Sequence, residues 1–295
     1  MKIAVVGDVH LVWDERDVRA LDACGYDLIL FVGDLAGYGA VGAIEVGRSI
    51  RELRTPTLVM PGNHDAVTLA QLAAEVLRTP RLRLAREALA LGMHTRVQQL
   101  TAALAPVPLC GYSLHHFEAL DLSVLAARPH TLGGERLGFR RYLAKRFGVQ
   151  RMTESISKLC ALFDQVPNDR RVLVLAHCGP HGLGDKRTAI YGCDFLPTEG
   201  DWGDRDLSAA LAYAREHGKR VLGVVAGHMH HRLRGGGERV WHVERDGLFH
   251  VNAARVPRKR RGPAGEERHH VRITLEGERA QVDAVWLPLP EREGT

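Results

Sequence analysis

Five short apolar runs in this chain each end next to a polar residue that can bind a metal ion, and this repeated design limits the folds the chain can adopt. Each run is four or five residues long and rich in β-branched side chains, which favours buried strands over helices. Because the runs are apolar almost throughout, both faces of the strands must be covered, as in sheets flanked by helices. The runs are Ile3–Val6, Leu28–Val32, Thr57–Met60, Val172–Leu175 and Val221–Val225.

The polar residues after these runs form a mixed set of oxygen and nitrogen ligands without thiolates. In open α/β sheets, ligands bind beyond the carboxyl ends of the strands, so we expect these side chains to meet at one edge of a sheet. Such a set suits Mn, Fe, Zn, Co or Mg better than a structural zinc site. The candidates are Asp8, His10, Asp34, Asn63, His177, His228 and His230.

Seven ligands exceed the needs of one tetrahedral ion, but they fit two ions if one carboxylate bridges them. Two-metal sites hold their ions about 3.5–4 Å apart and clamp the attacking and leaving oxygens of a displacement at phosphorus. The ligand set is therefore compatible with a dinuclear centre of this kind.

Several candidates also have explanations that need no metal. Asp8 and Asp34 could cap the helices that follow them, and Asn63 lies in a Pro-Gly-Asn segment typical of turns. A single histidine after a strand, such as His177, often only forms a hydrogen bond there. These explanations are independent of one another, whereas one metal site accounts for the whole set.

The motifs resemble those of the calcineurin-like metallophosphoesterase superfamily. The family pattern is D-x-H, G-D, G-N-H-D/E, a later single His and G-H-x-H, and this chain contains GDVH, GDL, GNHD, AH and GHMH in that order. The motifs extend from Asp8 to His230, and GNHD is the most specific. The resemblance implies an α/β sandwich of two sheets flanked by helices. It also implies a hydrolase of phosphate esters that requires two divalent metal ions.

The resemblance divides the candidate ligands between the two metals. Asp34 would bridge both ions, together with the hydroxide that attacks phosphorus. The remaining six would form two sets: Asp8, His10 and His230 for the first metal, and Asn63, His177 and His228 for the second.

Two further residues of the GNHD motif receive catalytic roles from the resemblance. His64 would face the substrate and stabilise the transition state or protonate the leaving oxygen as a general acid. Asp65 would accept a hydrogen bond from His64 and set its orientation, unless it only caps a helix that starts near Ala66.

Because both ends of the chain contribute ligands, we expect one domain over residues 1–295, with an inserted helical region at about 66–165. A loop at about 179–206 follows His177 and is rich in Gly, Asp and aromatic residues. Loops of this length are usually functional or disordered, so we interpret it as a lid or substrate wall. Its candidate contact residues are His181, Arg187, Asp201 and Trp202.

The remaining elements follow from local patterns. We expect strands in VPLCGYS and LDLSVLAA, and four tail strands that pair as hairpins of a second sheet: Val240–Glu244, Leu248–Asn252, Val271–Leu275 and Gln281–Leu287. The expected helices are Asp14–Cys24, Val41–Leu53, Val67–Leu77, Leu84–Leu104, Glu135–Arg146, Met152–Phe163 and Asp206–Glu216.

Three other features concern cofactors and compartment. The glycines of Gly37–Gly42 resemble a dinucleotide fingerprint, but no acidic residue follows at the required distance, so we expect no nucleotide cofactor. Five scattered cysteines argue against a disulfide framework and for a reducing compartment. The first residues have the pattern of a strand rather than a signal peptide, and no apolar run is long enough to span a membrane, so we expect a cytoplasmic protein.

Within the phosphoesterase class, a phosphodiester is favoured because simple bacterial members of the superfamily often cleave diesters. A phosphomonoesterase is the alternative, in which Arg140, Arg141 and Arg187 could bind the dianionic phosphate. A nuclease would use the basic run Arg258–Arg261, which otherwise is a solvated loop, and the net charge of +5. A catalytically silent binding scaffold is disfavoured because every ligand position is filled.

Small-molecule or nucleotide phosphate esters are the expected substrates. The segment Tyr112–His116 could direct an imidazole toward them or form a surface histidine pair.

Overall fold

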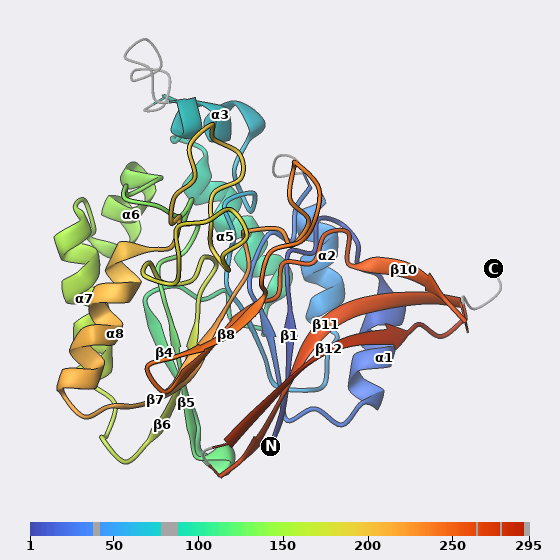
Figure 1. Cartoon of the computed structure of the whole chain (residues 1–295). Helices are drawn as coiled ribbons and strands as arrows, with labels where there is room; N and C mark the ends of the chain where they lie inside the picture. The colour runs from blue at the N-terminus through green and yellow to red at the C-terminus, as the bar shows by residue number, and fades with distance from the viewer. Residues whose placement is uncertain (38–41, 78–87, 264, 278, 292–295) are drawn as a thin grey trace.

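Two six-stranded sheets lie face to face between layers of helices in the computed structural model of this protein (Figure 1). The structure describes residues 1–37, 42–77, 88–263, 265–277 and 279–291. The architecture confirms the α/β two-sheet sandwich that the sequence predicts. No helix within these ranges is long and apolar enough to cross a membrane.

The first sheet joins the two ends of the chain. Its strands run in the order β10-β11-β1-β2-β3, with β12 also beside β11, and the neighbours β1, β2 and β3 are parallel. Its members are β1 (Lys2–Val6), β2 (Leu28–Phe31), β3 (Thr57–Val59), β10 (Lys259–Gly262), β11 (Gly265–Glu276) and β12 (Arg279–Pro288).

The second sheet is built from the middle of the chain and has the order β4-β5-β6-β7-β9-β8. Its central strands, from β5 to β9, are parallel. Its members are β4 (Ser113–Phe117), β5 (Leu122–Ala126), β6 (Arg171–Leu175), β7 (Arg220–Ala226), β8 (His242–Arg245) and β9 (Leu248–Asn252).

Alternate residues of the apolar strands enter different cores, which explains their continuous hydrophobicity. Ile3 and Val5 of β1 pack between the sheets, whereas Ala4 and Val6 pack against the helices of the first sheet. Likewise, the residues of β6 alternate between the inter-sheet core and the core under the helices of the second sheet. Successive strand side chains point to opposite faces, so a strand buried on both faces has no place for a polar residue.

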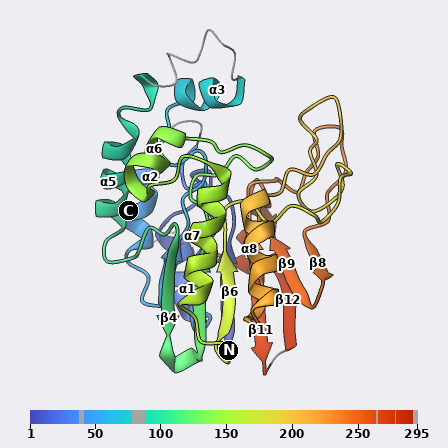
Figure 2. The ribbon, with the colours of Figure 1, turned by 90° about the vertical axis from the view of Figure 1, so that its left-hand side faces the viewer.

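The helices form two outer layers. Figure 2 shows α7 and α8 side by side over the second sheet, while α1, α2 and α5 share a core with the first sheet. The helices are α1 (Glu15–Ala23), α2 (Ala43–Ile50), α3 (Leu69–Leu77), α5 (Met93–Leu104), α6 (Arg140–Phe147), α7 (Met152–Asp164) and α8 (Arg205–Glu216), and a short 3-10 helix, η2, spans Glu118–Leu120.

The start of α1 illustrates how the sequence sets an element boundary. The carboxylate of Asp14 accepts a hydrogen bond from the amide of Arg16, and Asp17 reaches back to the amide of Asp14. This reciprocal capping satisfies amides that have no partner within the helix.

Some expected elements differ from the structure. The tail strands do not form one sheet, because β8 and β9 extend the second sheet while β11 and β12 extend the first. VPLCGYS is not a strand as a whole, since β4 begins at Ser113. The region 66–165 combines helices with β4 and β5, and β5 confirms the strand expected in LDLSVLAA. Parts of two expected helices, residues 41 and 84–87, and most of the Gly37–Gly42 pattern lie outside the described residues.

The basic run is part of the first sheet rather than a loop. Arg258 is buried, donates a 2.7 Å hydrogen bond to the carboxylate of Asp17 and lies over the ring of Trp13. Arg260 pairs with Glu267 and stacks on Trp286. Two of the run's four cations therefore already have protein partners.

Candidate metal centre

The candidate ligands follow strands of both sheets. Asp8 and His10 come after β1, Asp34 after β2 and Asn63 after β3 of the first sheet, whereas the remaining three, His177, His228 and His230, follow β6 and β7 of the second. The expectation of a single sheet edge is therefore wrong. The carboxyl ends of parallel strands from two facing sheets open at the same end of the sandwich, and the site lies between them.

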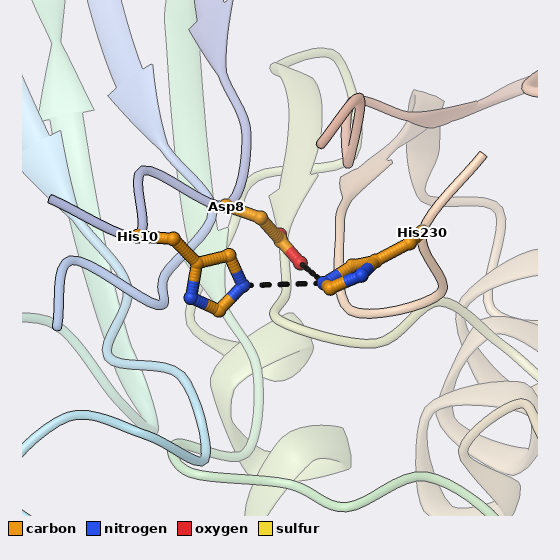
Figure 3. Close-up of side chains that lie close together, drawn as sticks. All are labelled: Asp8, His10 and His230. Atoms are coloured by element: carbon orange, nitrogen blue, oxygen red, sulfur yellow. Dashed lines mark hydrogen bonds and ion pairs between the residues drawn. The ribbon is translucent and has the colours of Figure 1, made fainter. Parts of the chain in front are cut away.

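One cluster contains Asp8, His10 and His230, whose ligand atoms all lie within 4.8 Å of one another. Figure 3 shows the three side chains pointing toward a common point. The Nε2 atom of His230 lies 3.3 Å from Oδ2 of Asp8 and 3.2 Å from Nε2 of His10. Oδ2 of Asp8 is buried and has no hydrogen-bond partner among the described residues.

A second cluster contains Asp34, His177 and His228, again within 4.8 Å of one another. Oδ2 of Asp34 lies 3.7 Å from Nε2 of His177 and 3.9 Å from Nε2 of His10, so this carboxylate is shared between the clusters. Oδ1 of Asn63 joins the second cluster, 2.9 Å from Nε2 of His177. The structure thus brings all seven candidate ligands together in the two expected groups, and their binding of metal stays a prediction.

The hydrogen bonds of the imidazoles favour metal binding. Nδ1 of His177 lies 2.7 Å from the carbonyl of Val32, and a carbonyl only accepts, so Nδ1 carries the proton. Nε2 of the same ring faces the second cluster, 2.9 Å from Oδ1 of Asn63, and is the ring nitrogen placed to bind a metal ion. His10 and His228 likewise donate to backbone carbonyls, at 3.1 and 3.2 Å, and so leave one ring nitrogen each for a ligand. Metal-binding histidines commonly fix their tautomer in this way.

Backbone strain concentrates at these residues. Asp8, His10, Asp34 and His228 all have positive φ, at 25°, 42°, 52° and 70°. Side chains with a Cβ rarely adopt this conformation, and such strain persists only where surrounding structure enforces it, often at functional sites. The segments around Asp34 are closely packed. A Cβ on Gly62 would collide with the carboxylate of Asp34, so position 62 requires glycine.

The buried carboxylates and imidazoles of the site shift one another's pKa values. Burial opposes ionisation of Asp8, but the neighbouring imidazole of His230, 3.3 Å from Oδ2, outweighs it and holds the pKa of this carboxyl below its usual value. Burial also opposes a charge on His177, yet the carboxylates of Asp34 and Asp8 raise its pKa. In His228 burial prevails and lowers the pKa to about 3, which keeps the ring neutral. A buried site whose carboxylates draw protons to their neighbours has the electrostatic character of a cation site.

His64 and Asp65 differ in how the structure places them. His64 lines the cavity beside the clusters, with its amide donating to Oδ1 of Asp34 at 2.9 Å and its ring 5.3 Å from that of His10. Asp65 is buried, and its two carboxylate oxygens accept hydrogen bonds from the amides of Ala36 and Gly62 at 2.9 and 2.8 Å. Asp65 therefore braces the loops that carry Asp34 and Asn63, and its action on the ring of His64 stays a prediction.

A cavity of about 1100 Å³ adjoins the clusters, and the segment 179–206 contributes many of its lining residues. Of the residues singled out in that segment, His181, Asp201 and Trp202 line the cavity, whereas Arg187 pairs with Glu199 and lies outside the lining.

The other predicted substrate contacts lie elsewhere. His115 and His116 belong to β4 and bond to Ser113 and Ser123, as a surface histidine pair would. Arg140 and Arg141 are not part of the cavity lining. The arginines of the lining that carry exposed side chains are Arg136, Arg205, Arg232 and Arg234.

Three supporting residues were not found from the sequence. His130 donates from Nδ1 to the carbonyl of Gly62 at 2.9 Å, and buried Arg239 donates to the carbonyl of His230 at 2.7 Å. The carbonyl of Leu132 accepts from both His228 and Trp202. These contacts involve backbone oxygens distant in sequence, and no local pattern marks them.

Comparisons with known proteins identify a family and structures with a similar fold. The family model for calcineurin-like phosphoesterases matches residues 1–232. The crystal structure of TT1561 from Thermus thermophilus is 13% identical with a TM-score of 0.54, over 96% of this chain and 97% of that one. A dimetal phosphatase from Danio rerio is also 13% identical, with a TM-score of 0.51 over 96% and 95%. A search of curated proteins finds no match.

The fold and the site define a metal-dependent hydrolase of phosphate esters. The family match covers most of the chain, and the protein belongs to the calcineurin-like phosphoesterase family, whose centre holds two divalent metal ions. The described residues fit such a centre, because two clusters of oxygen and nitrogen ligands share one carboxylate.

Proposed function

We propose that this protein hydrolyses a phosphodiester, with a phosphomonoester as the alternative. The observation that carries the proposal is the position of the two ligand clusters at the end of a cavity of about 1100 Å³. That volume exceeds the needs of a phosphate group and leaves room for organic groups on phosphorus. The monoester alternative is supported by the exposed arginines of the lining, which could neutralise a dianion.

The candidate site residues would have separate roles in metal binding and proton transfer. Asp34 would bridge two divalent ions, for which Mn is our first choice and Fe, Zn, Co or Mg are alternatives. The ions would neutralise charge on the phosphate and lower the pKa of water toward neutrality. His64, at the cavity wall, would donate a proton to the leaving oxygen. The remaining ligands would hold the ions in two sets: Asp8, His10 and His230, and Asn63, His177 and His228.

The segment 179–206 would form the wall that selects the substrate. Its ends are tied together where the amide of Asp204 donates to the carbonyl of Gly179 at 2.7 Å and the amide of His181 to the carbonyl of Asp204 at 3.1 Å. A loop closed at its base keeps a defined shape, so its lining side chains can contribute to specificity.

The test compares bis-p-nitrophenyl phosphate with p-nitrophenyl phosphate in Mn and in chelator. We expect chelator-sensitive cleavage with a higher kcat/KM for the diester. Faster cleavage of the monoester would establish the alternative. Cleavage of neither ester by a protein with two bound metals would contradict both and support a binding scaffold.

A further inference from the structure

Apolar side chains from two separate segments line part of the cavity. Leu72 and Val76 belong to α3, whereas Phe195, Leu196 and Trp202 belong to the segment 179–206. We call these five residues the apolar wall. Figures 1 and 2 place both segments at the end of the sandwich away from the N-terminus.

The apolar wall leaves hydrophobic surface uncovered. Val76 is 61% exposed and Leu196 is 44% exposed, although both face a cavity. The rings of Phe195 and Trp202 meet edge to face at 5.0 Å, and Nε1 of Trp202 donates to the carbonyl of Leu132 at 2.8 Å. These contacts fix the positions of the two rings, so the rings do not turn inward to bury their exposed faces. Exposed apolar surface within a cavity typically marks the binding site of a ligand.

The apolar wall and the candidate metal centre face the same cavity. Asp34, His64 and His228 contribute to its lining together with the five apolar residues. A phosphate group at the metal ligands would therefore direct one of its organic groups toward this wall.

The cavity lining contains arginines that are available to an anionic ligand. Within the part of the chain that the structure describes, neither Arg136 nor Arg232 forms an ion pair, and the guanidinium of Arg234 lies over Phe195 at 5.9 Å. Several carboxylates of the lining are engaged, since Glu135 pairs with Arg205, Asp194 with Arg239 and Glu199 with Arg187. The cavity thus offers uncommitted cations beside apolar surface, which suits an anionic ester with an apolar group.

We propose that the apolar wall is a subsite for an aromatic or other planar apolar group that the phosphate ester carries. A planar group fits because it can pack against the edge-to-face pair of Phe195 and Trp202. The proposal rests on the function proposed above, since it places the phosphate at the candidate metal centre.

The test measures binding rather than turnover. Methylphosphonate and phenylphosphonate differ only in the apolar group and are not hydrolysed, so calorimetric titration into the Mn-loaded protein isolates the subsite. We expect phenylphosphonate to bind about tenfold more tightly or better, because the ring leaves water on the apolar wall. Equal affinity for the two would overturn the subsite and leave the proposed function intact. Binding of neither probe, nor of inorganic phosphate, would overturn the placement of phosphate and both proposals with it.

Two variants locate the effect on the wall. Leu196→Asp should reduce the preference for phenylphosphonate over methylphosphonate to about threefold or less. The added carboxylate repels the phosphonate group of both probes alike, so the ratio of the two affinities reports the apolar wall alone. Val76→Asp tests the opposite segment in the same way and replaces it if Leu196→Asp does not fold. Val240→Asp is the matched control, because Val240 is 47% exposed and lies outside the cavity lining. An undiminished preference in both wall variants would overturn the proposal. So would a dimer of the parent protein that Leu196→Asp dissociates, since a second copy would then cover the wall.

Discussion

Trp202 and His228 donate hydrogen bonds to the same acceptor, the backbone carbonyl of Leu132. The distances are 2.8 Å from Nε1 of Trp202 and 3.2 Å from Nε2 of His228. One residue belongs to the cavity wall and the other to the candidate metal centre. The shared carbonyl therefore couples the orientation of a ligand imidazole to the position of the segment 179–206.

This coupling predicts the effect of Trp202→Phe on metal binding. Phenylalanine keeps an aromatic ring but lacks the indole N–H, so the carbonyl of Leu132 loses one of the contacts that position it. We expect metal affinity, measured by calorimetric titration of the metal-free protein, to fall roughly threefold to tenfold, less than for direct partners of a ligand. Trp286→Phe, on β12, should leave the affinity unchanged. Equal affinities in the two variants would refute the coupling.

Asp34→Asn tests the bridging carboxylate. Asparagine keeps the size of the side chain but removes the negative charge that lies within 4 Å of His10 and His177. We expect bound metal and activity to be lost together, because a neutral amide does not hold two cations at close range. Elemental analysis of the purified variant supplies the stoichiometry. Two metals retained per chain would show that Asp34 is not the bridge.

His64→Ala separates proton transfer from metal binding. His64 lies in the cavity lining but outside both ligand clusters, so its removal should not change the metal content. We expect turnover to fall by roughly 10²–10⁴, the usual scale of general acid–base assistance. The measurement is kcat together with metal content in the same preparation. An unchanged kcat would exclude His64 from the mechanism.

Buried histidines predict instability in acid. Burial lowers the pKa of His250, His269 and His270 to about 4, 2 and 3, from an ordinary value of 6.5. Below pH 6.5 the unfolded chain therefore binds more protons than the folded protein, so stability is complete above that pH and falls as the pH drops toward 4. Each group contributes a slope of up to about 1.4 kcal/mol per pH unit.

Urea unfolding of the metal-free protein between about pH 7.5 and about pH 5 measures this effect. His270→Asn should reduce the pH dependence, whereas His217→Asn, at an exposed position, should not. A free energy of unfolding that does not change over this range would contradict the prediction.

Arg258→Ala should destabilise the protein strongly. The substitution would remove the 2.7 Å partner of the buried carboxylate of Asp17 and leave only its 3.3 Å ion pair with Arg268, so we expect a cost of about 3 kcal/mol, the low end for breaking a buried pair. Arg261→Ala removes an exposed cation of the same run and should change stability by less than about 0.5 kcal/mol. Denaturant titration of the two variants gives the comparison. Equal stabilities would mean that Arg258 is not part of the framework.

The basic run and the tail strands are two places where the structure differs from what the sequence predicts. The composition of Arg258–Arg261 is compatible with a solvated loop or a nucleic-acid contact, yet the run begins with a buried ion pair and continues as β10. Its partner Asp17 lies 241 residues away, so no local pattern could have revealed it. The tail strands show the same limit, because their hydrophobic alternation predicts strands but carries no information on which sheet each one joins.

The sequence by itself predicted the candidate ligands, their order and the strands that carry them, because a doubly buried strand must be apolar and the polar residues that follow mark where it ends. It thereby also determined the family. Tertiary structure decided that the ligands come from two sheets, that Asp34 lies between the clusters and that Leu132, His130 and Arg239 support them. These features depend on distances between segments far apart in the chain and on backbone carbonyls, which every residue carries. Such contacts leave no signature in the identity of the amino acids.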